Sequence, residues 1–296
     1  MEQYFANREL LSIGDINTGL TENKIFANER PDETWNKEHV IIRNCTFAKI
    51  GFKKSKFKLC DLSFCIFIDC YFKHTEFHQT KLTGCVFINC NFDDSQFFKC
   101  DFQYAKFTDC YIPFDNIRSN LPIEQENLCA DLCQNLAIQC SKAGDDINYK
   151  KYFFEKKKAN ERHQFRKVFH RSKSYYSKYN FFERLEAAVL WIYSKIDCYI
   201  WGYGERLINF IFNSILIMCL FALIYSRRFT ILNPNIEVSL KLFDYIKLSV
   251  YSFFSFNISQ LEGLIYPQTA MNIEGIIGLL IFGLFLAGMF RNLTKR

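Results

Sequence analysis

Residues 85–107 read "CVFINCNFDDSQFFKCDFQYAKF", and a phenylalanine returns at every fifth position of this stretch. Followed outward in both directions, the step of five stays unbroken over fourteen positions, all of them large and apolar. No α-helix or flat β-strand has a period of five residues, so the pattern is an internal repeat. The fourteen positions are Phe47, Phe52, Phe57, Leu62, Phe67, Phe72, Phe77, Leu82, Phe87, Phe92, Phe97, Phe102, Phe107 and Ile112.

The residue two places before each apolar position is small in thirteen of the fourteen repeats. This slot holds eight of the thirteen cysteines, which we interpret as small hydrophobic side chains. Stacked cysteines could come close enough to bridge, but a cytoplasmic domain is kept reduced. A strict step of five lacks the short ligand spacing of a zinc site, so we expect no metal and no cofactor. The eight are Cys45, Cys60, Cys65, Cys70, Cys85, Cys90, Cys100 and Cys110.

Over about residues 40–113 this repeat resembles the pentapeptide-repeat family, whose members form a β-solenoid, a right-handed quadrilateral β-helix. The resemblance implies four pentapeptides in each coil, so that residues twenty apart stack on one another. It also implies that the central Phe and the small residue before it both point inward. Fourteen repeats then make three and a half coils, with residues 1–39 as a candidate cap.

Four apolar residues occupy outward positions beside Phe67 and Phe87, where other faces of the repeat carry lysines and aspartates. In a solenoid with twenty residues per coil they form one patch on one face. An apolar patch on a charged surface indicates a contact. Two interpretations stay open: cover from within the chain, or an interface with a subunit or a protein partner. The four residues are Ile66, Ile68, Val86 and Ile88.

The stretch 114–184 is predicted to be a basic helical linker. Leu128, Leu132 and Leu136 fall on one stripe of a helix, and Gly144 separates this helix from a second one. The pattern therefore predicts a helical hairpin directly after the repeat.

Positive charge is concentrated before the apolar part of the chain: residues 150–184 contain twelve Lys and Arg against three acids. Such a stretch could bind nucleic acid, but next to a membrane the expected partner is anionic lipid, so we predict no nucleic-acid binding. Residues 185–206 include Trp191, Tyr193 and Tyr199, which suit a helix lying in the membrane interface.

Two apolar runs, 207–225 and 273–291, are predicted to be transmembrane helices, and residues 207–225 and 275–290 of these runs contain no charge. The basic stretch before the first run and the cations of the tail, 292–296, place both termini in the cytoplasm by the positive-inside rule. Arg227 and Arg228 follow the first run and count against this orientation, but they are outnumbered.

Between the two spans, residues 240–263 contain an apolar stretch that is too short and too polar for a third span. It is predicted to be a re-entrant pore helix with a filter loop, because irregular backbone at membrane depth needs a water-filled path. Within 205–291 the sequence "VYSFFSFNI" resembles the potassium-channel superfamily, with Ser252, Ser255 and Phe256 at matching positions. The resemblance implies a homotetramer in a bacterial inner membrane that contacts lipid and permeant ions.

The filter that should follow the pore helix departs from the potassium-channel pattern. Gln260 and Glu262 stand where two glycines would allow a ladder of backbone carbonyls, so we expect no potassium selectivity. Four Glu262 side chains could instead form a carboxylate ring that favours cations, with neutral oxygens from Asn257, Ser259 and Gln260. Two alternatives stay open: Glu262 faces solvent or pairs with an arginine, or the vestibule favours anions.

The second span carries the candidate gate. Gly283 near its middle is the predicted hinge. Leu286, Met289 and Phe290 lie at its cytoplasmic end and could close the pore as a hydrophobic gate.

These patterns favour a cation channel with a cytoplasmic pentapeptide-repeat domain. The rival interpretation is a membrane-anchored interaction scaffold, in which the spans only hold a β-helix that binds a partner. We expect no enzyme, because the sequence shows no nucleophile–base arrangement, phosphate-binding glycine loop or metal-ligand spacing.

Overall fold

The computed structural model describes residues 9–16, 19–30, 34–170, 174–203, 208–232, 242–256 and 265–294. The chain divides into two compact units, Met1–Ala188 and Val189–Arg296. The first contains the repeat and the helices after it, and we call it the solenoid unit. The second contains the long apolar helices, and we call it the helical unit.

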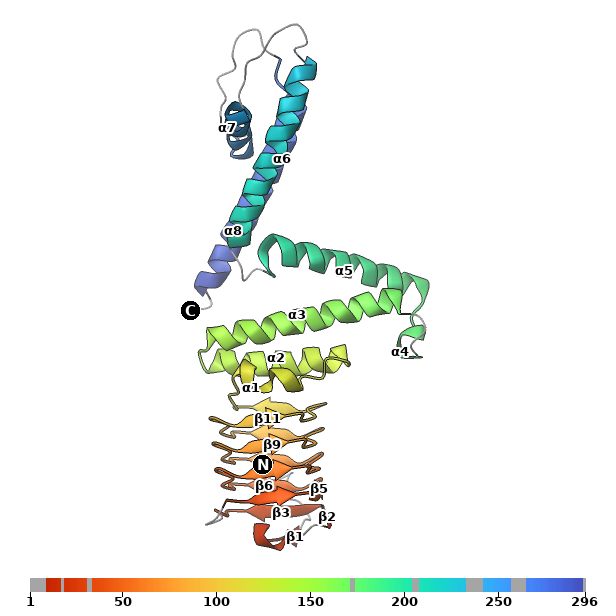
Figure 1. The fold of residues 1–296 in the computed structure, drawn as a ribbon, viewed down its shortest axis with the longest axis vertical. Helices are drawn as coiled ribbons and strands as arrows, with labels where there is room; N and C mark the ends of the chain where they lie inside the picture. The colour runs from red at the N-terminus through yellow and green to blue at the C-terminus, as the bar shows by residue number, and fades with distance from the viewer. Residues whose placement is uncertain are drawn as a thin grey trace. The chain divides into compact units, whose positions relative to one another are not determined.

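The solenoid unit is built from parallel strands that stack coil upon coil (Figure 1). One face is a six-stranded sheet in the order β1-β3-β6-β8-β10-β12, and another is the sheet β11-β9-β7-β4. On two further faces the backbone pairs through single bridges, such as Gly51 with Tyr71 and Asp61 with Lys81. Every pairing within the repeat joins residues twenty apart, for example Phe67 with Phe87. The predicted β-solenoid is therefore confirmed.

Each strand of the solenoid is short, because the chain turns a corner every five residues. The strands are β1 (Glu9–Leu10), β2 (Leu20–Glu22), β3 (Lys24–Ala27), β4 (Asn36–Glu38), β5 (Ile41–Arg43), β6 (Thr46–Ala48), β7 (Lys56–Lys58), β8 (Ile66–Ile68), β9 (Glu76–His78), β10 (Val86–Ile88), β11 (Gln96–Phe98) and β12 (Lys106–Thr108).

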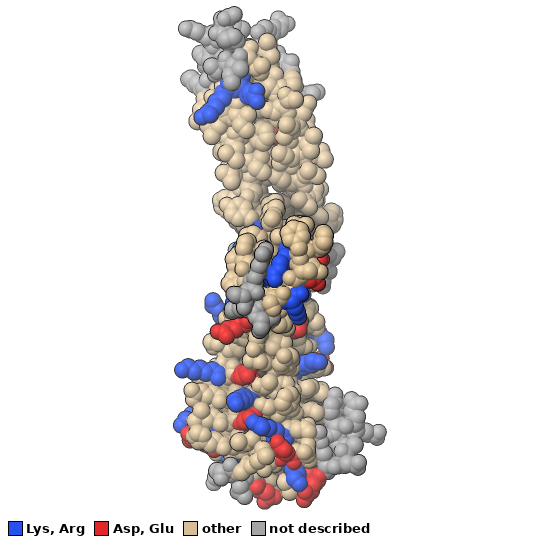
Figure 2. Space-filling view, turned by 90° about the vertical axis from the view of Figure 1, so that its right-hand side faces the viewer, with Lys and Arg blue, Asp and Glu red and all other residues tan. Residues whose placement is uncertain are grey.

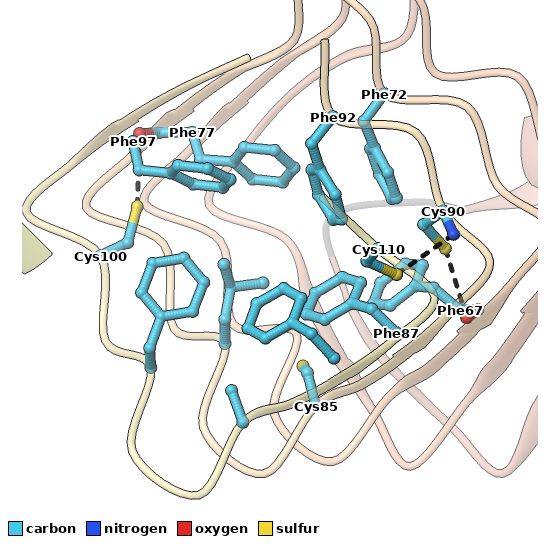
Figure 3. Close-up of a cluster of buried hydrophobic side chains, with 14 of the residues drawn as sticks. Phe67, Phe72, Phe77, Cys85, Phe87, Cys90, Phe92, Phe97, Cys100 and Cys110 are labelled. Atoms are coloured by element: carbon cyan, nitrogen blue, oxygen red, sulfur yellow. Dashed lines mark hydrogen bonds between the residues drawn. The ribbon is translucent and has the colours of Figure 1, made fainter. Parts of the chain in front are cut away.

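Columns of stacked phenylalanine rings fill the interior of the solenoid (Figure 3). The ring centroids of Phe47, Phe67, Phe87 and Phe107 follow one another at 4.9, 5.0 and 4.9 Å. Rings of neighbouring columns meet edge to face, as Phe67 does with Phe72 at 5.5 Å. Burying a Phe side chain contributes about 1.5–3 kcal/mol, so these columns are the main stabilising element of the fold.

At the corners of the solenoid the backbone adopts a left-handed conformation, which the residue types at those positions do not predict. Every fifth residue from Asn44 to Asp109 has a positive φ, between 48° and 68°, and only Gly84 among them is a glycine. The left-handed region costs other residues about 1–2 kcal/mol. The ten corners from Asn44 to Asn89 are each held by a hydrogen bond to the next coil, for example from Lys49 N to Ile68 O at 2.8 Å.

The buried cysteines do more than fill the small slot, because their thiols donate to main-chain carbonyls of the coil below. Cys85 Sγ donates to Leu62 O at 2.9 Å, and Cys90 Sγ to Phe67 O at 3.4 Å (Figure 3). Thr75 occupies the same slot and donates to Phe52 O at 2.6 Å, so a hydroxyl in this slot makes the same kind of link between coils as a thiol. Burial raises the pKa of the Cys85 thiol to about 12, and the thiols are free rather than bridged.

The solenoid begins well before residue 40. Strand β1 pairs with β3, and β3 pairs with β6, so part of the N-terminal segment forms a further coil. Phe26 stacks on Phe47 with their ring centroids 4.9 Å apart, and the ring centroids of Trp35 and Phe52 are 5.4 Å apart. The repeat pattern did not reveal this coil because its inward residues are not spaced by five.

The outward apolar residues of β8 and β10 lie side by side, since Ile66 pairs with Val86 and Ile68 with Ile88. Ile68 is buried, and the other three are half-buried within the chain itself. Their predicted role as an interface stays a prediction.

Helices close the C-terminal end of the solenoid: α1 (Phe114–Ile117), α2 (Glu126–Lys142) and α3 (Asp146–Phe169), with a 3-10 turn at Arg118–Asn120. Gly144 has a φ of +73°, and the Asp145 carboxylate accepts from the N–H groups of Ile147 and Asn148. These are the signals that end one helix and begin the next. The predicted hairpin after the repeat is therefore present (Figure 1).

Side-chain amides of α2 form hydrogen bonds with backbone groups in and just after the last strand, β12. Asn135 Oδ1 accepts from Phe107 N at 2.8 Å and its Nδ2 donates to Phe107 O at 2.9 Å. Gln139 Oε1 accepts from Asp109 N at 2.9 Å. An unpaired strand edge is a template for association with another chain, and these amides occupy that edge.

We expect Asn135→Ala to destabilise the solenoid, because it leaves the N–H and the C=O of Phe107 without partners at a cost of about 1–3 kcal/mol each. Thermal unfolding followed by circular dichroism measures the loss. Asp131→Ala, at an exposed position of the same helix, is the matched control and should unfold near the wild-type temperature. Equal shifts in the two variants would contradict the edge-pairing role.

Candidate functional site

The helical unit contains two helices that are long and apolar enough to cross a membrane, α6 (Ile208–Leu232) and α8 (Gln268–Thr294). Their candidate spans, Ile208–Arg228 and Gln268–Phe290, both have a mean hydropathy of 2.2. Most of each span is exposed in the single chain, which is unlike the core helix of a soluble protein. Figure 2 shows the surface over these helices as a broad band almost without charged side chains.

A third helix, α7 (Leu242–Phe253), packs against both long helices. Its 12 residues extend about 18 Å, which is too short for a hydrocarbon core of about 30 Å. Tyr245 and Leu248 of α7 are buried together with Ala222 and Tyr225 of α6 and Met271 of α8. This arrangement packs a short helix against two span-length helices, and its role as a pore helix stays a prediction.

Two glycines of α8 allow the carboxyl end of α7 to approach it closely. A Cβ on Gly278 would lie 2.0 Å from the carbonyl oxygen of Phe253, and a Cβ on Gly275 would lie 3.3 Å from that of Ser252. Gly283 is different, because no described atom lies within 4 Å of its Cβ position. Gly275 and Gly278 are thus packing positions, and the hinge at Gly283 stays a prediction.

A buried carboxyl group lies at the junction of the three helices. Glu274 of α8 has no exposed surface, and its carboxyl oxygens contact the hydroxyls of Tyr225 on α6 and Ser249 on α7. Ser249 Oγ also lies 2.9 Å from Met218 O of α6. The cluster therefore joins one polar side chain from each helix.

A second α7 hydroxyl extends this cluster. Ser252 Oγ donates to Met271 O of α8 at 2.8 Å and lies 3.3 Å from the Tyr225 hydroxyl oxygen. We call Tyr225, Ser249, Ser252 and Glu274 the hydroxyl–carboxyl cluster. All four are buried in a part of the chain that is otherwise apolar.

Sequence reasoning missed Glu274, although the signal was available. It is the single charged residue in the candidate span Gln268–Phe290. A lone ionisable residue inside such a helix marks a functional position by default. Its partners on α6 and α7 could not be found from the sequence, because they depend on how the helices pack.

An open groove of about 730 Å³ lies beside the carboxyl end of α7. Ser252, Ser255, Gln268 and Asn272 give it polar walls, and apolar residues of α8 complete it. Ser255, two residues after the end of α7, has a φ of 55°.

The four predicted filter residues, Asn257, Ser259, Gln260 and Glu262, lie outside the described residues. The predicted gate residues are on α8, and in the single chain Leu286 is 39% exposed, Met289 37% and Phe290 66%. The gate stays a prediction.

The predicted interfacial helix is α5 (Phe181–Trp201), preceded by the short α4 (Ser174–Ser177). Phe181, Leu185, Val189, Ile192 and Ile196 follow one stripe of α5, and all are exposed. A continuous apolar stripe on an exposed helix is the pattern of interfacial membrane binding.

Polar side chains hold both ends of α5. Arg184 donates to Lys167 O and Tyr176 O, each at 2.7 Å, and fixes the start of the helix within the solenoid unit. Within the helical unit, the Asn213 side chain of α6 donates to Tyr199 O and Ile200 O at the end of α5, each at 3.2 Å. Each end of α5 is therefore held by hydrogen bonds from side chains of its own unit.

Comparison with known proteins bears on the repeat. Residues 75–111 match the family model described as "Pentapeptide repeats (8 copies)". The chain carries a pentapeptide-repeat domain. The matched range lies wholly within the solenoid, so the family match says nothing about the function of the helical unit. No curated protein sequence matches the chain.

Among solved structures, the pentapeptide-repeat domain is similar to QnrB1, described as a plasmid-mediated fluoroquinolone resistance protein. The full-length QnrB1 structure is 15% identical, with a TM-score of 0.15, over 36% of this chain and 80% of that one. A trypsin-treated variant is 11% identical, with a TM-score of 0.14, over 35% of this chain and 70% of that one. At these values the two likenesses add nothing to the family match.

Proposed function

We propose that this protein is a homotetrameric membrane channel that conducts cations without potassium selectivity and carries its pentapeptide-repeat domain in the cytoplasm. The observation that carries the proposal is α7, a helix too short to span that packs on two span-length helices. A re-entrant helix of this kind is tolerated at membrane depth where it lines a water-filled path.

The way in which α7 is held supports a pore rather than an anchor. A scaffold that only needs attachment to a membrane has no use for a third helix inserted between its spans. Here α7 is held by its contact with Gly278 and by hydroxyl contacts to Glu274. These contacts give the short helix a defined position.

Electrostatics favours cations over anions. The carboxyl end of a helix carries a partial negative charge, and the carboxyl end of α7 borders the groove with its hydroxyl and amide walls. Beyond it, Glu262 supplies the proposed carboxylate ring. Gln260 and Glu262 in place of glycines argue against a potassium-type filter.

The solenoid unit would sense a signal or assemble the subunits, with the Ile66–Ile88 patch as a candidate contact for a second copy or a protein partner. Its basic helices and the apolar stripe of α5 suit an anionic membrane surface. We propose no enzymatic activity.

Reconstitution in liposomes tests conduction. Vesicles with wild-type protein are expected to pass cations faster than empty vesicles, and Glu262→Lys is expected to shift the reversal potential toward anions. Glu183→Lys makes the same charge change on α5, outside the pore module, and should leave the reversal potential unchanged. No flux above empty vesicles would favour the anchored scaffold, and an unchanged potential in Glu262→Lys would reject the ring.

A further inference from the structure

We propose that Glu274 is a proton-binding site: its side chain is a neutral carboxylic acid that holds α7 against α6 and α8. The proton site is independent of whether the protein conducts ions. Its effect on ion flux rests on the proposed channel function.

The first argument is a count of hydrogens around Ser249. The Ser249 hydroxyl has one hydrogen, yet its oxygen contacts two acceptors, Met218 O at 2.9 Å and a carboxyl oxygen of Glu274. If Glu274 were ionised, one of these contacts would bring two oxygens together without a hydrogen between them. A proton on Glu274 removes the conflict, because the acid donates to Ser249 and Ser249 donates to Met218 O.

The rest of the cluster supplies no spare hydrogen. The Tyr225 hydroxyl donates its hydrogen to the other carboxyl oxygen of Glu274. The Ser252 hydroxyl donates its hydrogen to Met271 O at 2.8 Å. The hydroxyl oxygens of Tyr225 and Ser252 also lie 3.3 Å apart, and neither hydroxyl has a second hydrogen to donate to this contact. All contacts shorter than 3 Å in the cluster are satisfied only in the protonated form.

The second argument is the lack of a compensating cation. Of the residues that the structure describes, Tyr225 is the only titratable one bonded to Glu274. A buried carboxylate without a positive partner is costly, so such a group stays neutral. The charged side chains described on α6 and α7 are exposed: Arg227, Arg228, Asp244 and Lys247.

Loss of the proton would therefore release α7. An ionised Glu274 would draw water or move toward it, and both responses break the contact that positions α7. A rise in pH that removes this proton is thus expected to loosen the α6–α7–α8 packing. In the proposed channel it would lower ion flux, since the pore helix loses its support.

Infrared spectroscopy of the purified full-length protein tests the site directly. At pH 7 exposed carboxyl groups are ionised, so Glu274 should give a C=O stretching band of a protonated carboxylic acid. The band is expected to vanish in Glu274→Gln and to persist in Asp244→Asn, the matched control on α7. It is expected to move to higher frequency in Tyr225→Phe, because one hydrogen bond to the carboxyl group is lost.

Absence of the band in wild type, or its persistence in Glu274→Gln, would overturn the proposal. If Glu274→Gln does not fold, the wild-type band and its shift in Tyr225→Phe decide the question alone. Liposome flux measured over the same pH range is a separate arm. Flux should fall in wild type as the band disappears and stay constant in Glu274→Gln. A band without any flux would leave the proton site standing and reject the channel.

Discussion

Gly278→Ala is expected to break the packing of α7 on α8, whereas Gly283→Ala is expected to leave it intact. The added Cβ at position 278 would lie 2.0 Å from the carbonyl oxygen of Phe253 and 2.9 Å from its carbonyl carbon. These are backbone atoms, so no side-chain rotation relieves the clash. Overpacking of this kind costs about 1–3 kcal/mol, and more where the backbone must shift.

Thermal unfolding in detergent and flux in liposomes measure this effect. For the unfolding measurement Gly283→Ala is the matched control, because it makes the same chemical change on the same helix with no described atom within 4 Å. It should unfold at the wild-type temperature or slightly above, since alanine favours a helix over glycine by about 1 kcal/mol. A Gly278→Ala protein with wild-type flux and stability would contradict the contact between α7 and α8.

Phe72→Ala is expected to be the most damaging single truncation in the solenoid. Phe72 is fully buried in the middle of a column, and its ring stacks at 5.0 Å on both Phe52 and Phe92. It also meets the neighbouring columns edge to face, for example Phe67 at 5.5 Å. Removing a buried Phe side chain costs about 3–5 kcal/mol, because the cavity adds to the lost burial.

Chemical denaturation followed by the β-signal in circular dichroism measures the loss. Phe98→Ala is the matched control, because Phe98 is 44% exposed on the outer face and stacks only on His78 among the described rings of its sheet. It should cost about 1 kcal/mol or less. Comparable losses in the two variants would show that the inward columns are not the main source of stability.

The solenoid was largely predictable because its interior imposes one requirement on every coil from about residue 40 onward. A large apolar side chain must return at each fifth position, so the period appears directly in Phe47 to Ile112. For the position two residues before each of these, the sequence predicted only that the side chain is small. That Cys85 and Thr75 both donate to carbonyls of the coil below depends on coil stacking, and no single repeat contains both partners.

The first coil and the C-terminal closure were not predictable for a related reason. Phe26 and Trp35 enter the interior at irregular spacing, so they carry no periodic signal. Asn135 looks like an ordinary polar residue of α2. Its pairing with Phe107 exists only because the helix lies across the edge of the last strand.

In the helical unit, composition identified both apolar helices and the short helix between them, because transfer into lipid depends on each segment's own side chains. Glu274 was visible as the one charge in its span, but its meaning was not. The predicted filter residues from Asn257 to Glu262 lie outside the described residues and stay predictions.

The sequence by itself therefore determined the repeat, its inward columns and the candidate spans, because each follows from a periodic or local preference for burial. Only the tertiary structure decided how Tyr225, Ser249 and Glu274 meet, and why Gly278 must lack a side chain. Those relations join atoms that are 25 to 49 residues apart in the chain, where no local preference acts. Packing brings them together, and the hydrogens that they share then set the chemistry.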